Sequence, residues 1–102
     1  NYIIFCSECE KLTIQVTNAC FMFLFQSATT EQTFCLPNDS TTIEIFQEAL
    51  NNIRLSPIFT INDVDFQLAL NSVFNYNINI NGVSMILDNE ASLLFYKFWS
   101  EI

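Results

Sequence analysis

Histidine is absent from this chain of 102 residues, and glycine occurs only once, as Gly82. Without histidine the chain has no Ser-His or Cys-His catalytic pair and no histidine-based metal site. A single glycine excludes a glycine-rich loop that cradles phosphate groups. The enzymatic options that remain are paired carboxylates, a cysteine thiolate and an all-cysteine metal site, and we expect a protein that is not an enzyme.

Positive charge is almost as scarce. Only Lys11, Arg54 and Lys97 face eleven Asp and Glu residues, and the formal net charge is -8. Such a chain repels a phosphate backbone and offers few cations that would release counterions, so we expect no direct binding to nucleic acid. The same balance disfavours an anionic membrane surface.

Long apolar runs are also missing. The longest, residues 19–25, is far shorter than the roughly 20 residues that span a bilayer, and no signal-peptide pattern is present. Apolar residues nevertheless make up 51% of the chain and include eleven Phe, which excludes a disordered tail. We therefore expect one soluble globular domain over residues 1–102, because a chain of this length supports a single core.

Alternation of apolar and polar residues indicates a strand-rich chain. A helix can be drawn through residues 63–75, but the period of two matches that segment better. Residues 29–36 fit a short helix and a strand equally well. Asn81 and Gly82 mark a tight turn or bulge. The predicted strands cover residues 2–6, 12–17, 21–26, 58–61, 64–70, 75–81 and 83–87.

An internal helix is predicted over residues 41–54. Thr41 and Glu44 have the spacing of a capping box, and apolar residues follow at helical spacing. Pro57 prevents the helix from continuing.

A second amphipathic helix is predicted at the end of the chain, with Asp88 or Asn89 as its cap. Its apolar stripe is still running at residue 102, so we expect the helix to lead into a coiled coil beyond that point. Together the elements predict an α+β fold, a small antiparallel β-sandwich or barrel-like head of about seven strands with an internal helix and a C-terminal helix. The stripe consists of Ala91, Leu94, Phe95, Phe98, Trp99 and Ile102.

The four cysteines bear on metal binding and on the redox compartment. Cys6 and Cys9 could approach one cation, but a structural zinc site needs a second close pair, so we expect no metal. Cys20 and Cys35 have apolar neighbours, which is typical of free thiols in a core, although four cysteines could also form two disulfides in a secreted domain. We expect free thiols and a reducing compartment, with the glycosylation triplet at residues 38–40 as the one contrary hint.

Acidic residues supply the other chemical candidates. Glu8 and Glu10, or Asp63 and Asp65, could act as acid and base or bind a hard cation. A solvated sheet edge explains Asp63 and Asp65 better, because they open an apolar alternation. We expect no catalytic residue and no cofactor.

The hairpin between the two longest predicted strands has an apolar tip. Val73 and Phe74 occupy this tip, where the domain's own core offers them no obvious place. An exposed apolar tip is a feature that docks on other proteins, and ordinary packing against a neighbouring loop is the alternative.

The order of elements resembles the head domains of the DNA end-joining scaffold superfamily, which includes XLF, PAXX and the partner of DNA ligase IV. An early hairpin ending at Thr17-Asn18, an aromatic strand and an internal helix are followed by a long hairpin and a terminal amphipathic helix. In that superfamily the early strand tends to end in Thr-Asp before an aromatic residue, often Trp. Here Asn18 replaces the Asp, and Phe21 or Phe23 replaces the Trp.

The resemblance covers almost the whole chain and implies an XLF-like scaffold in non-homologous end joining of double-strand breaks, located in the nucleus. It implies that Leu70, Val73 and Phe74 enter a pocket on a homologous head. It also implies a homodimer held by the C-terminal helix. The residues that would lead into that coiled coil are Leu94, Phe98, Trp99 and Ile102.

The centriolar cartwheel protein shares the same head fold. The alternative function is therefore a structural assembly head of a centriole cartwheel or kinetochore type, in the cytoplasm or at the centrosome. A metal- or thiol-dependent enzyme is the alternative from a different class.

Overall fold

The computed structural model describes residues 2–7, 10–27, 29–71 and 75–102. Within these ranges it holds two four-stranded antiparallel sheets and two α-helices, which confirms the predicted α+β fold. The first sheet has the order β1 (Tyr2–Ser7), β2 (Glu10–Val16), β3 (Cys20–Gln26) and β4 (Glu31–Pro37). The second has the order β5 (Ile58–Ile61), β6 (Val64–Leu70), β7 (Tyr76–Ile80) and β8 (Val83–Ile86).

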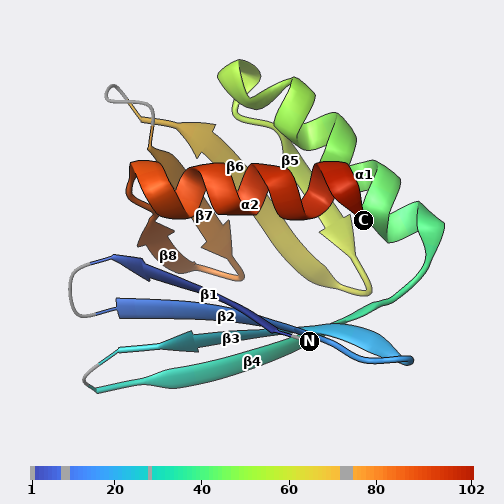
Figure 1. The fold of residues 1–102 in the computed structure, drawn as a ribbon, viewed down its shortest axis with the longest axis horizontal. Helices are drawn as coiled ribbons and strands as arrows, with labels where there is room; N and C mark the ends of the chain where they lie inside the picture. Colours follow the sequence, from blue (N-terminus) through green and yellow to red (C-terminus); the bar gives the residue numbers. More distant parts are fainter. Residues whose placement is uncertain (1, 8–9, 28, 72–74) are drawn as a thin grey trace.

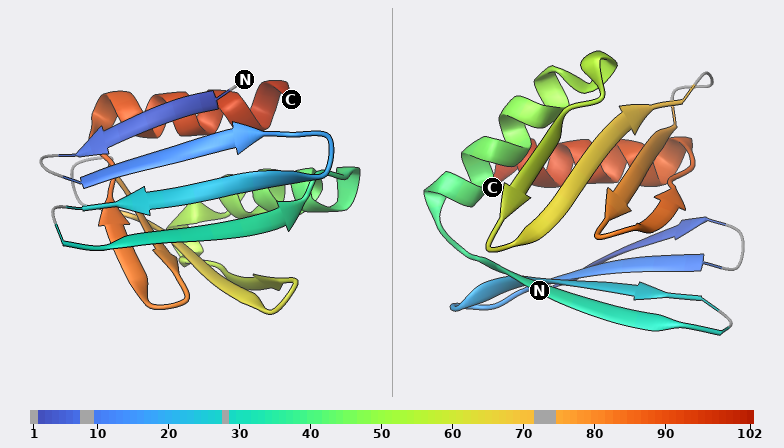
Figure 2. Two further views of the ribbon diagram at one scale, coloured as in Figure 1. Left: turned by 90° about the horizontal axis from the view of Figure 1, so that it is seen from below. Right: turned by 180° about the vertical axis from the view of Figure 1, so that it is seen from behind.

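One helix connects the two sheets along the chain, and the other follows the second sheet. Helix α1 (Ser40–Asn51) and a short 3-10 turn, η1 (Ile53–Leu55), join the two sheets, and α2 (Asn89–Glu101) follows the second sheet. Helix α2 crosses one face of the second sheet, the first sheet lies below both of them, and α1 lies next to the C-terminal end of α2 (Figure 1). Figure 2 shows the first sheet from its outer side, with both helices and the second sheet behind it.

The ambiguous segment at residues 29–36 is a strand, β4, which pairs with β3 along its whole length. This strand brings the number of strands in the described residues to eight, against the expected value of about seven. The two sheets remain separate, so the described part of the chain forms a sandwich and no closed barrel.

Two-residue turns set the register of the second sheet. Asn62 and Asp63 join β5 to β6, and Asn81 and Gly82 join β7 to β8. All four have positive φ, between 49° and 87°. Such turns match the twist of the paired strands, and Asn, Asp and Gly tolerate positive φ best. The turn predicted at Asn81-Gly82 is therefore confirmed.

The helix caps are partly as predicted. The side chain of Asp88 accepts a hydrogen bond from the backbone N–H of Ala91 at 2.8 Å, as one of the two expected caps of α2. For α1 the expected capping residue was wrong. Asp39, and not Thr41, accepts from the N–H of Thr42 at 2.9 Å, and α1 starts at Ser40. An ionised carboxylate near the positive end of a helix is a stronger acceptor than a hydroxyl.

The core is an aromatic cluster to which both helices and both sheets contribute. The rings of Phe46 on α1 and Trp99 on α2 stack with centroids 4.0 Å apart and an angle of 5°. Phe23 of β3 and Phe66 of β6 lie against Phe46, with centroid distances of 5.8 Å and 5.4 Å. All four side chains are buried. The remaining apolar residues of the sheets pack around this cluster.

The expectation of free thiols at Cys20 and Cys35 was wrong, because the two residues form a disulfide. Their Cα atoms lie 5.7 Å apart although 15 residues separate them in sequence. Antiparallel pairing of β3 with β4 places Cys20 opposite Pro37 and Cys35 opposite Met22, so the cysteines are diagonal neighbours. Phe21, Phe34 and Leu36, which adjoin the cysteines in sequence, belong to the opposite face of the sheet, because successive residues of a strand alternate between faces.

Trp99→Ala should lower the free energy of unfolding by about 3–5 kcal/mol, because it removes the largest side chain of the aromatic cluster. Trp99→Phe should cost much less, since it keeps a ring and removes an indole N–H that has no hydrogen-bond partner. Urea unfolding followed by circular dichroism measures both, with Ser100→Ala, at an exposed position of the same helix, as the control. Equal losses for the Ala and Phe variants would contradict this account of the core.

Cys35→Ser should lower the free energy of unfolding by about 3 kcal/mol, because the bridge closes a loop across a sequence separation of 15 residues. Peptide mapping of the unreduced protein by mass spectrometry should recover a fragment that links Cys20 to Cys35. Thr33→Ser, at an exposed position of the same strand, is the control and should leave stability unchanged. Recovery of both cysteines as free thiols from the native protein would refute the bridge.

Candidate functional site

The predicted dimerisation residues of α2 divide between the core and the surface. Trp99 is fully buried, and Phe98 is half-buried with its ring edge-on to Phe21 and Trp99, at centroid distances of 6.1 Å and 4.9 Å. Trp99 therefore belongs to the core and offers no surface to a partner, which corrects that part of the prediction. Leu94 and Ile102 are exposed, so of the four predicted residues these two can contact another chain.

Two further residues of α2, Leu93 and Tyr96, are exposed, and the sequence argument missed them. Adjacent residues of a helix point about 100° apart, so Leu93 and Leu94 leave the helix on different sides of the buried stripe. The sequence could have indicated this exposure, because a single buried stripe of a helix does not cover two adjacent leucines fully. We use the name outer face of α2 for its four exposed large apolar residues, Leu93, Leu94, Tyr96 and Ile102, which leave the helix in different directions. Their side chains are between 42% and 54% exposed.

An open depression of about 470 Å³ adjoins this face. Ser92 fixes its base: the Ser92 hydroxyl accepts a hydrogen bond from the backbone N–H of Tyr76 at 2.9 Å and donates one to the carbonyl of Leu87 at 3.2 Å. Burial raises the pKa of the Tyr76 phenol, and the nearby Tyr96 raises it further. Tyr76 is therefore neutral at physiological pH and supplies contact area with a polar tip. The depression is lined by Tyr76, Asn89, Ser92, Leu93 and Tyr96.

The structure describes the base of the long hairpin, which was predicted to have an apolar tip. Val73 and Phe74 lie outside the described residues, so their role as a docking tip stays a prediction. Leu70, at the end of β6, is half-buried. The backbone N–H of Asn71 donates to the carbonyl of Asn75 at 2.6 Å, which closes the loop between the two strands. The structure therefore confirms the hairpin and leaves the three partner-binding residues untested.

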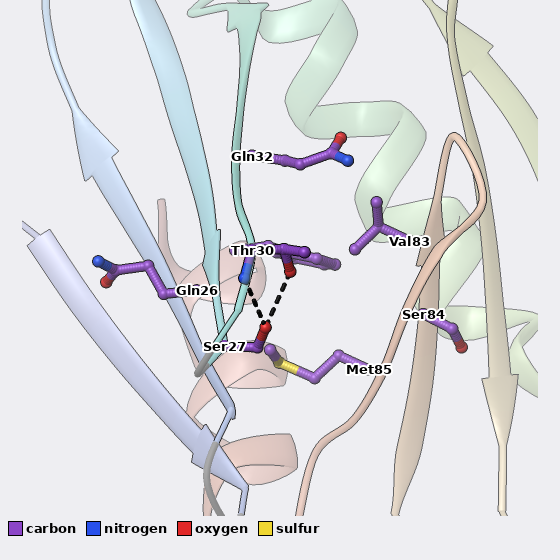
Figure 3. Close-up of a pocket in the computed structure, with 8 residues that line it drawn as sticks. Gln26, Ser27, Thr30, Gln32, Val83, Ser84 and Met85 are labelled. Carbon is purple, nitrogen blue, oxygen red and sulfur yellow. Dashed lines mark hydrogen bonds between the residues drawn. The ribbon is translucent and has the colours of Figure 1, made fainter.

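A small cavity separates the ends of the two sheets (Figure 3). The hydroxyl groups of Ser27 and Thr30 lie 2.8 Å apart on one side, and Val83 and Met85 of the second sheet lie opposite. Its volume is about 50 Å³. Sites for organic ligands usually measure about 300–1,000 Å³, so this cavity suits one or two water molecules and excludes an organic cofactor.

Of the acidic and thiol candidates for chemistry, the structure describes both members of only one pair in full, Asp63 and Asp65. Asp65 accepts a hydrogen bond from the hydroxyl of Thr60 at 2.8 Å on the exposed face of the second sheet, and Asp63 lies in the turn beside it. Glu8 and Cys9 lie outside the described residues. Across the described ranges, no group of three or more His, Cys, Asp or Glu residues could hold a metal ion. The absence of a metal and of a cofactor stays a prediction.

Both helices are too short and too polar to cross a bilayer, and the part of the chain that the structure describes contains no other α-helix. The expected lack of membrane partners stays a prediction.

Comparison with known proteins gives no further guide, because no family model matches the chain and neither the curated proteins nor the solved structures contain a match. The resemblance to end-joining heads therefore stays a prediction from the sequence. Two surfaces are the candidates for function, the outer face of α2 and the β6–β7 hairpin.

Proposed function

We propose that this domain is a non-enzymatic interaction head that joins copies of itself, and homologous heads, through the outer face of α2 and the β6–β7 hairpin. The observation that carries the proposal is the exposure of Leu93, Leu94, Tyr96 and Ile102 on one helix. Four exposed large apolar side chains on one short helix leave apolar area uncovered, and such area is typical of surfaces that bind other proteins.

The helix does not need these residues to pack on its own domain. Ala91, Phe95 and Trp99 already bury one side of α2 in the core. The exposed part of the four outer residues adds nothing to that burial and leaves apolar area in water that a second helix would cover. A helix that is apolar on more than one side is suited to contact its own core and a partner helix at the same time.

The finer form of the proposal is an XLF-like scaffold head in non-homologous end joining, located in the nucleus. Its support is the resemblance in element order. In the chain, an internal helix follows the first sheet and precedes the second, and an amphipathic helix comes last. The Cys20–Cys35 disulfide weighs against a nuclear location, since disulfides persist mainly in oxidising compartments. Self-association through α2 does not depend on the compartment and is the firmer part of the proposal.

Sedimentation equilibrium of the chain should show a monomer–dimer equilibrium that Leu94→Asp weakens at least about tenfold, because the change places a charge in the covered surface. Ile86→Asp is the matched control, since it adds the same charge at an apolar position of β8 that is also exposed. Dimerisation should strengthen as salt is raised, because two copies of charge -8 repel each other. A wild-type chain that stays monomeric at every concentration and salt level would overturn the proposal.

The hairpin is tested separately by Val73→Asp in mixtures with homologous head domains. Association with those heads should be lost while the thermal unfolding temperature stays unchanged. Loss of folding would instead place Val73 in the core and remove the hairpin from the proposed surface.

A further inference from the structure

A second apolar groove lies on the other side of the molecule, between α1 and the edge strand β5. These two elements lie side by side in Figure 1 and in the rear view of Figure 2. The groove has a volume of about 230 Å³, which gives room for one large apolar side chain. We call it the α1–β5 groove. It is lined by Ile45, Glu48, Ala49, Asn52, Pro57, Ile58 and Phe59.

The chain path between α1 and β5 builds the groove. The amide of Asn52 donates to the carbonyl of Glu48 at 2.9 Å and closes the end of α1. Ser56 then takes a left-handed conformation with φ of 50°, and Pro57 follows with a fixed φ. This reversal returns β5 alongside α1.

The floor of the groove is the ring of Phe59, which packs against other rings, and the small side chain of Ala49 leaves the groove open. The ring of Phe59 is stacked on that of Phe66 and stands edge-on to that of Phe46, with centroid distances of 5.2 Å in both cases. Ala49, on the helix side, has only a methyl group and is buried. A preformed apolar floor of this kind needs no rearrangement when a side chain enters.

Ile58, the first residue of β5, lines the groove and is 73% exposed. Among the large apolar residues that the structure describes, only Leu55, in η1, is more exposed, at 78%. An exposed apolar side chain on the wall of an apolar hollow is poorly solvated, and a partner would cover it.

Charge decides what kind of partner fits. Glu48 lines the groove, and Glu44 lies one turn earlier on the same side of α1. Both carboxylates are exposed, and within the described ranges neither forms an ion pair. Arg54 is exposed nearby but does not line the groove. A second copy of this acidic chain would meet like charge here, whereas a segment with positive charge would meet opposite charge, so charge favours a basic partner.

We propose that the α1–β5 groove binds a basic, apolar peptide segment of another protein. One large apolar side chain of that segment fills the hollow between Ala49 and Ile58, over Phe59. Lys or Arg residues beside it pair with Glu44 and Glu48. This surface is distinct from the outer face of α2 and from the β6–β7 hairpin, so the proposal adds a partner to the proposed function and does not rest on it.

Selection from a phage-displayed library of random peptides of about a dozen residues tests the proposal on the whole chain. Enriched peptides should combine an aromatic or aliphatic residue with flanking Lys or Arg. Fluorescence anisotropy of the enriched sequences should show at least about a tenfold loss of affinity with Ile58→Lys, which removes the apolar rim and repels basic peptides. Ile86→Lys, at an exposed position on the opposite edge strand, is the matched control and should change affinity less than about twofold.

The electrostatic part has its own variants. Glu48→Gln should weaken binding about threefold or more and reduce its salt dependence, whereas Glu31→Gln, on exposed β4, should do neither. The proposal is overturned if no peptide is enriched, if enriched peptides lack basic residues, or if they bind the Ile58→Lys variant as tightly as the wild type. Leu94→Asp should leave peptide binding intact, so failure here and failure of α2-mediated dimerisation are separate results.

Discussion

The stacked rings of Phe46 and Trp99 are the contact on which the rest of this domain depends. They join α1 to α2, which are far apart in sequence, and the side-chain amide of Gln47 adds a hydrogen bond to the backbone carbonyl of Trp99 at 2.9 Å. Phe23 from the first sheet and Phe66 from the second close on the same pair. In a domain of this size a single core has to supply the burial energy that offsets the loss of chain entropy, and this cluster lies within that core.

This contact also fixes the position of the outer face of α2 and the shape of the α1–β5 groove. Once Trp99 is locked against Phe46, the rotation of α2 is set, and Leu93 and Tyr96 have to face outward. The position of Phe46 likewise sets how closely α1 approaches β5, and therefore the shape of the α1–β5 groove. The indole N–H of Trp99 has no acceptor, a loss of about 1–3 kcal/mol that ring packing outweighs. Packing, and not polar pairing, decides this core.

Strands and hairpins were predictable because each sheet has one buried face, which leaves a period of two in the sequence. The terminal helix was predictable because its buried side leaves apolar residues at helical spacing. The sequence did not show which of those apolar residues are buried. Trp99 enters the core and Leu94 does not because of where Phe46 lies, a fact of tertiary packing. The Cys20–Cys35 bridge was equally hidden, since it depends on the register of β3 with β4. The groove was invisible because α1 and β5 meet only in the folded chain.

Charge gives the two surfaces opposite physical characters. The outer face of α2 can join like-charged copies only where apolar contact exceeds their repulsion, so added salt strengthens that contact. In the α1–β5 groove the carboxylates of Glu44 and Glu48 attract a basic segment, so added salt weakens binding there. Under the two proposals, self-association uses the apolar helix and the groove takes a different, cationic partner, so the two kinds of neighbour would not compete for one surface of this acidic domain.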